Sequence, residues 1–151
     1  KDLGGGVLKT EIHEIDLLNW LFGPPKKIQA EGGCYGPFAL DVEDTANLIL
    51  EYDEFVAKIN LCFMNKKQSR EINIKYQHCT IEMDFIKNKL VAKNNKTNKV
   101  SNFDFAVEND LLFELQAKYF LKNFNDNNQD YINSIKQNSL FIDTCIRQIN
   151  Q

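Results

Sequence analysis

The chain is 151 residues long, which suits one compact domain of about 100–200 residues. Its hydrophobic content of 43% excludes a disordered polypeptide, and no apolar run approaches the roughly 20 residues that a membrane-spanning helix needs. The net charge is −3, and the 18 basic residues alternate with acids instead of forming a basic stripe, so we expect neither nucleic acid nor a membrane as a partner.

Residues 8–22 have the pattern of an amphipathic helix. Apolar side chains recur at three- or four-residue spacing from Leu8 to Phe22, and Gly23 followed by two prolines predicts the end of the helix. Residues 26–33 then predict a strand, and a loop is expected from there to Asp44.

Two runs of alternating apolar and polar side chains come next. Residues 45–52 place Ala46, Leu48 and Leu50 on one face, and residues 55–63 alternate in the same way. The short connection between the runs predicts a hairpin. Shorter strands are expected at residues 69–77, 79–85, 89–93 and 99–105.

Helical spacing returns at Asn109 and continues to about Phe124. After an Asn-rich break, the apolar residues between 131 and 149 predict one or two closing helices. The order of helix, strands and helices predicts an α+β fold, with a large, mostly antiparallel open-faced sheet backed by helices. We expect a single domain over residues 1–151.

All seven glycines and all three prolines fall within the first 37 residues. Neither G-x-G-x-x-G nor G-x-x-x-x-G-K-[ST] occurs, so we expect no cofactor-binding residues in this chain. The remainder is expected to build its turns from asparagines, Asp53-Glu54 and Gln77-His78. The first residues lack the apolar core of a signal peptide, and the cysteine pattern predicts reduced, buried thiols in a cytoplasmic protein, at Cys34, Cys62, Cys79 and Cys145.

The predicted first helix carries an unusual set of polar residues. Lys9, His13, Asp16 and Trp20 recur at i, i+4, i+7 and i+11, which puts them in one stripe, with Trp20 expected in the core. An ammonium and a carboxylate beside an imidazole can tune it for proton transfer near neutral pH. Gly4-Gly5-Gly6 lets the backbone pass close to a ligand ahead of the helix.

The stripe by itself leaves several roles open for the histidine. A lone histidine on a partly buried helix is more often a hydrogen-bonded structural residue than a catalytic one. The metalloprotease motif H-E-x-x-H fails because Leu17 occupies the second histidine position. A metal site built from His13, Asp16 and distant acids is a weaker alternative, and we assign no metal ligands.

One segment resembles a known family. GGGVLKTEIHEIDLLNWLFGPPKKIQAEGG is similar to the start of the C-terminal domain of the Gfo/Idh/MocA oxidoreductases, in its order of G-G-G, H-E-I-D and W-L-F-G. The resemblance continues through DVEDTANLILEY, the strand carrying Arg70, TIEMDF and FELQAKYFLKNF, so it spans nearly the whole chain.

The resemblance implies a two-domain enzyme. An N-terminal Rossmann domain, absent from these residues, would bind NAD or NADP, and this C-terminal domain would supply one wall of the substrate pocket and an open sheet face for a homo-oligomer, a dimer or a tetramer. The substrate would be a sugar, a nucleotide sugar or a cyclic polyol. His13 would take or give the proton of a substrate hydroxyl, and Lys9, Thr10 and Asp16 would bind the substrate.

The chain departs from the family at one position. Many members carry an aspartate four residues before the histidine, where this sequence has Lys9, so either Asp16 or Glu14 orients the imidazole or the chemistry is altered. The alternative interpretation is a non-catalytic dimerisation or ligand-binding module without its own cofactor site. The open sheet favours this alternative, because its uncovered face can seek a partner chain.

Overall fold

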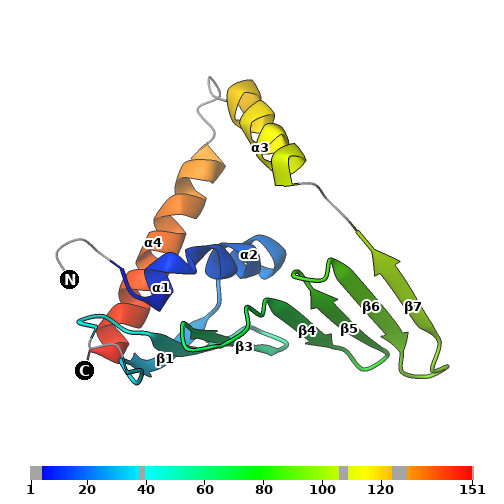
Figure 1. Cartoon of the computed structure of the whole chain (residues 1–151), viewed down its shortest axis with the longest axis horizontal. Helices are drawn as coiled ribbons and strands as arrows, with labels where there is room; N and C mark the ends of the chain where they lie inside the picture. Colours follow the sequence, from blue (N-terminus) through cyan, green and yellow to red (C-terminus); the bar gives the residue numbers. More distant parts are fainter. Residues whose placement is uncertain (1–4, 38–39, 106–108, 124–128, 151) are drawn as a thin grey trace. The chain divides into compact units, whose positions relative to one another are not determined.

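The computed structural model describes residues 5–37, 40–105, 109–123 and 129–150 (Figure 1). The chain divides into unit 1, Lys1–Met64 with Asn128–Gln151, and unit 2, Asn65–Asn127. No helix in the described part of the chain is long and apolar enough to cross a bilayer.

Unit 1 contains a three-stranded antiparallel sheet in the order β1-β2-β3, which confirms the predicted strand and hairpin. Its strands are β1 (Lys27–Gly33), β2 (Thr45–Glu51) and β3 (Val56–Cys62). The register aligns Ala30, Leu48 and Ile59 across the sheet. Alternation along each strand places these apolar side chains on one face and mostly polar ones on the other, where Ile49 and Val56 are exposed.

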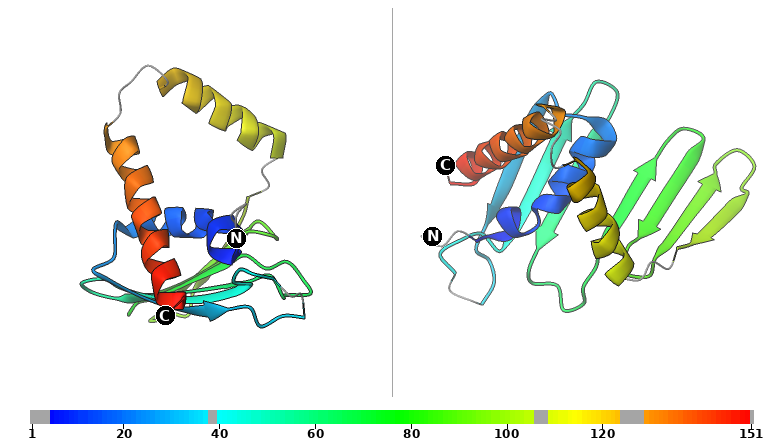
Figure 2. Two further views of the ribbon diagram at one scale, coloured as in Figure 1. Left: turned by 90° about the vertical axis from the view of Figure 1, so that its left-hand side faces the viewer. Right: turned by 90° about the horizontal axis from the view of Figure 1, so that it is seen from above.

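Helices cover the apolar face of this sheet. Both views of Figure 2 place α1 (Val7–Thr10), α2 (Ile12–Phe22) and α4 (Gln129–Ile149) on the same side of β1–β3. The buried hydrophobic core of the described residues lies between these layers and comprises Val7, Leu8, Ile15, Ala30, Ala46, Leu48, Leu50, Leu61, Phe141, Ile142 and Cys145.

The first predicted helix is broken at Glu11. Glu11 has φ −98° and ψ 29°, which ends α1 and starts α2 at a new angle. The backbone N–H groups of Val7 and Leu8 donate to the carbonyl and to Oε1 of Glu43, at 2.9 and 3.2 Å, and hold α1 in place. Gly6, at φ +87°, permits this approach, because a Cβ there would collide with the Glu43 carboxylate.

The end of α2 is as expected, but its tryptophan is not. Gly23 ends the helix at φ +75°, and its N–H donates to the carbonyl of Asn19 at 2.9 Å. Trp20, expected in the core, is 79% exposed. Trp20 follows the buried Ile15 by five residues, which is about 140° around α2, so its side chain points away from the core.

The last helix covers an edge of the sheet. In α4 the side-chain amide of Gln148 donates from Nε2 to the carbonyl of Ile28 at 3.0 Å and accepts from the N–H of Ala30 at 2.7 Å. This pair of bonds takes the place that a neighbouring strand would take on β1.

Unit 2 contains a four-stranded antiparallel meander followed by a helix. Asn88 and Asn98 adopt the left-handed conformation at φ 54° and 57°, which confirms that asparagine makes turns where glycine is absent. The α+β class and the antiparallel pairing are confirmed, with the strands distributed over two sheets. The elements are β4 (Glu71–Lys75), β5 (Cys79–Asp84), β6 (Lys89–Asn94), β7 (Val100–Asp104) and α3 (Asn109–Asn123).

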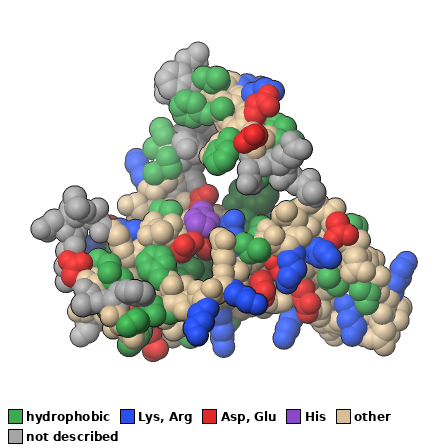
Figure 3. All heavy atoms as spheres, in the orientation of Figure 1, with side chains coloured by type: hydrophobic (Ala, Val, Ile, Leu, Met, Phe, Trp, Pro, Cys, Tyr) green, Lys and Arg blue, Asp and Glu red, His purple; other side chains and the backbone are tan. Residues whose placement is uncertain are grey.

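Helix α3 carries many apolar side chains at its surface (Figure 3). Phe113, Tyr119 and Leu121 are each about 70% exposed. The predicted Asn-rich break between α3 and α4 falls largely outside the described residues.

Candidate functional site

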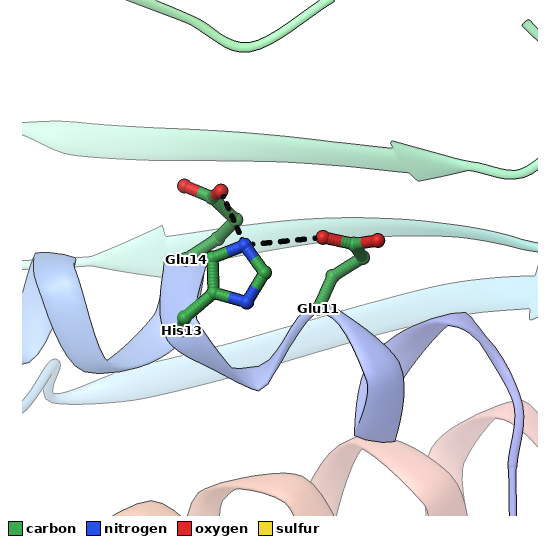
Figure 4. Close-up of side chains that lie close together, drawn as sticks. All are labelled: Glu11, His13 and Glu14. Carbon is green, nitrogen blue, oxygen red and sulfur yellow. Dashed lines mark ion pairs between the residues drawn. The ribbon is translucent and has the colours of Figure 1, made fainter. Parts of the chain in front are cut away.

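The first turn of α2 presents His13 to the surface. Its side chain is half-exposed, and Nε2 lies 3.2 Å from Oε2 of Glu11 and 3.0 Å from Oε1 of Glu14 (Figure 4). Both partners are on the same short stretch of chain, so the cluster is built locally around the break between α1 and α2.

The two carboxylates determine which ring nitrogen carries a proton. A carboxylate only accepts hydrogen bonds, so a favourable contact needs an N–H at Nε2. In the neutral imidazole this assignment leaves the lone pair on Nδ1. His13 can therefore accept a proton at Nδ1 while its Nε2–H stays between Glu11 and Glu14.

Glu11 is a partner that sequence reasoning missed. In a continuous helix, residues two apart point to different sides, so Glu11 would not reach His13. The non-helical backbone at Glu11 changes that direction. No local pattern in the sequence signals this break, whereas Glu14 was one of the two expected partners.

Asp16, the other expected partner, is bonded elsewhere. Its Oδ1 accepts from Nδ2 of Asn138 in α4, and Asn138 in turn accepts from Nδ2 of Asn19. Asp16 thus ties α2 to α4, and its predicted role in substrate binding remains a prediction.

Lys9 and Thr10 lie on α1, before the break at Glu11. Thr10 donates from Oγ1 to the carbonyl of Gly6 at 2.9 Å, a bond within its own helix turn. Lys9 lines a pocket of about 320 Å³, which it shares with residues 5, 32–34 and 40–43 and with the end of α4. His13 is not among the residues that line this pocket. The predicted stripe is therefore divided among three separate environments.

A buried carboxylate, that of Asp44, directly follows the pocket-lining residue Glu43 in the chain. Asp44, which is fully buried, accepts from the backbone N–H groups of Tyr35 at 3.1 Å and Gly36 at 2.7 Å and from Oγ1 of Thr45 at 2.9 Å. These bonds, led by the one from Tyr35, hold the pKa of Asp44 below its ordinary value. Sequence reasoning missed Asp44, because nothing in its local pattern marks it as buried.

The sequence predicts that all four cysteines are buried, but the structure buries only one of them fully. Cys34 is exposed and Cys145 is fully buried, while Cys62 and Cys79 are intermediate. None of these four described residues is in a disulfide. Burial raises the pKa of the Cys145 thiol to about 12. Cys34 follows the last residue of β1, where the chain leaves the covered sheet.

The ligand-capable atoms of Glu11, His13 and Glu14 all lie within 4.8 Å of one another. This group differs from the metal site that the sequence suggested as an alternative, because it lacks Asp16. Exposed acidic groups are common without a metal, and we assign none to the cluster.

Comparisons with known proteins identify the fold. An oxidoreductase from Agrobacterium radiobacter, in complex with NAD+, L-tartaric acid and magnesium, matches with a TM-score of 0.70 at 14% identity, over 93% of this chain and 46% of its own. UDP-N-acetylglucosamine 3-dehydrogenase GnnA from Acidithiobacillus ferrooxidans matches with a TM-score of 0.61 at 23% identity, over 75% and 36%. An inositol dehydrogenase homologue from Azotobacter vinelandii, complexed with NADH and myo-inositol, has a TM-score of 0.57 at 14% identity, over 68% and 29%.

The family assignment comes from the sequence itself. This chain spans less than half the length of each of those three structures, and no curated protein matches it. The sequence-family model of the GFO/IDH/MocA C-terminal domain matches residues 1–82, which are more than half of the chain. The chain therefore belongs to the Gfo/Idh/MocA oxidoreductase family, of which it is a C-terminal domain.

Proposed function

We propose that this chain is the substrate-binding and oligomerisation domain of an NAD(P)-dependent oxidoreductase. Its substrate would carry a hydroxyl or keto group on a sugar, a nucleotide sugar or a cyclic polyol. The family match supports the reaction class, and the two structural neighbours named for UDP-N-acetylglucosamine and myo-inositol support the substrate class.

The arrangement around His13 carries the proposal. Its half-exposed ring keeps Nε2 between Glu11 and Glu14, so Nδ1 is available to a substrate hydroxyl. In the oxidative direction the hydroxyl proton moves to Nδ1, the C–O bond becomes a carbonyl, and the hydride leaves the same carbon. The imidazolium that forms is stabilised by both carboxylates.

The hydride acceptor is assigned to a separate nucleotide-binding domain. This chain has no G-x-G-x-x-G sequence, and Gly6 serves a close contact with the Glu43 carboxylate. A nicotinamide cofactor would supply hydride transfer, whereas the residues described here hold the substrate and move its proton.

Replacing the histidine tests the proposal. In the protein that joins this domain to a nucleotide-binding domain, His13→Ala should lower turnover about 10²–10⁴-fold with NAD+ and either UDP-N-acetylglucosamine or myo-inositol. His78→Ala, which removes the chain's other histidine from an exposed turn of unit 2, is the matched control. Turnover of His13→Ala close to that of the parent would exclude His13 from the mechanism.

Oligomerisation is proposed from the incompletely covered surfaces. On the sheet of unit 2, Ile72, Met83, Leu90 and Phe103 share one face by register, and none of them is fully buried. The same observation favours the second candidate, a non-catalytic dimerisation module.

Light scattering should find a dimer or a tetramer, and a monomer at high concentration would contradict both ideas. Calorimetry with NAD+ separates them, since only the oxidoreductase binds nucleotide through its joined domain.

A further inference from the structure

Asn138 in α4 is joined to α2 by two hydrogen bonds. Its Nδ2 donates to Oδ1 of Asp16, and its Oδ1 accepts from Nδ2 of Asn19, each at a distance of 2.5 Å. Asn138 is only 8% exposed. Asp16 and Asn19 are three residues apart, so they lie on one face of α2. A buried amide thus connects two helices that are distant in the sequence.

The three side chains allow one orientation of the Asn138 amide. Because a carboxylate only accepts, the NH2 group must face Asp16 and the carbonyl must face Asn19. A turned amide, or a slide of α2 by one helical turn of about 5.4 Å, would leave the buried Asn138 amide mispaired. The contact therefore selects one rotation and one register of α2.

Few apolar contacts could fix α2 in the same way. Ile15 is the only buried residue among those described in α2, whereas Ile12, Trp20 and Leu21 are exposed. Leu18 also packs against the core, and the Phe22 ring meets the rings of Tyr52 and Phe55 edge-on, so apolar contacts hold the C-terminal end of α2, whereas the contact of Asp16 with Asn138 holds the turn next to His13. The break at Glu11 also separates α2 from α1, so the firm attachment of α1 does not set the rotation of α2.

We propose that Asn138 is a positioning residue for His13. It fixes α2 against α4 through Asp16 and Asn19, and His13 lies one turn before Asp16 on the same helix. The inference rests on the proposed function in one respect: if His13 transfers a proton, Asn138 determines where the ring is held.

Exchanging the amide and the carboxylate tests this role. Asn138→Asp alone places two carboxylates beside each other. The backbone N–H groups of residues 15–22 should then exchange with deuterium about tenfold faster, while those of β2 and β3 keep their protection. Asp16→Asn combined with Asn138→Asp lets both asparagines donate to the new carboxylate with no change in net charge, and should restore the parent rate. Gln137→Glu, exposed on the same helix, is the control that adds the same charge as Asn138→Asp.

The ring signals of the two histidines provide a spectroscopic readout. Compared with Gln137→Glu, Asn138→Asp should shift and broaden the signal of His13, and the double variant should return it to the parent position. The signal of His78, which belongs to unit 2, should stay unchanged throughout.

Several results would overturn the positioning role: parent-like exchange of α2 in a folded Asn138→Asp variant, an equal loss of protection in β2 and β3, or a double variant that restores nothing. If Asn138→Asp alone does not fold, refolding of the double variant supports the proposal and its failure to refold overturns it. These measurements do not involve turnover. A failure of the His13→Ala assay would therefore overturn the proposed function separately.

Discussion

The two units contain similar strands but different cores. In unit 1, Leu48 and Leu50 are fully covered by helices, and every residue of the buried hydrophobic core in the described chain belongs to this unit. In unit 2, Ile72 and Ile81 alternate with polar residues just as regularly, yet remain only half-buried, and Phe103 is 54% exposed. Alternation therefore determines which face of a strand is apolar, whereas packed helices determine whether that face is buried.

Truncating a buried leucine of unit 1 should have the largest effect on stability and tests this difference directly. Leu48→Ala should lower the free energy of unfolding by about 2–5 kcal/mol, because it leaves a cavity among fully buried neighbours. Ile81→Ala should cost only about 1 kcal/mol, since its side chain is already partly exposed to water. Equilibrium urea unfolding at matched protein concentrations measures both. Equal losses would mean that the face of unit 2 is covered in solution.

Removing the side chain that covers the edge of β1 should lower stability by a smaller amount. Gln148→Ala removes both side-chain bonds to β1 and should cost about 1–2 kcal/mol. It also exposes a strand edge that can pair with another chain. Thermal unfolding and light scattering check the two consequences, with the exposed Gln137→Ala on the same helix as control. A Gln148→Ala variant as stable and as monodisperse as that control would refute this role.

Each unit contains an aspartate that should make it sensitive to acid. Backbone bonds from Tyr35 and Gly36 lower the pKa of Asp44, and the ammonium and backbone N–H of Lys87 lower that of Asp84. Because the folded pKa is depressed, the stabilisation is complete above the ordinary aspartate pKa of about 3.9 and is lost as the pH falls below it. Asp44→Asn and Asp84→Asn should each flatten the fall in melting temperature between about pH 5 and 2. An unchanged slope would show that the other acids dominate.

Thiol reactivity should separate exposed from buried positions with little effect on stability. At pH 8, iodoacetamide should modify the exposed Cys34 in the folded chain. Cys145 should stay protected, because burial raises its pKa to about 12 and excludes the reagent. Peptide mass spectrometry identifies the modified residue. Rapid modification of Cys145 would indicate that α4 separates from the sheet, which would weaken the contrast between the two units.

Much of the fold follows from local patterns. Period-two alternation predicts the strands and the inner positions Ala46, Leu48 and Leu50, and Gly23 with its prolines predicts the end of α2. These predictions succeed because the backbone geometry of a strand or a helix end depends on residues close in sequence. His13 is also identified from its own segment.

The tertiary structure decided what surrounds that histidine. Contacts between Glu43 and the start of α1 accompany the break at Glu11, which brings Glu11 to His13. Asp16 pairs with Asn138, which is 122 residues away, instead of with the imidazole. The sequence by itself thus determined the strands, their apolar faces and the candidate histidine. Only the folded chain added Glu11 beside the expected Glu14 and paired Asp16 with Asn138, because neither a local backbone break nor a hydrogen bond between distant segments leaves a periodic signal in the sequence.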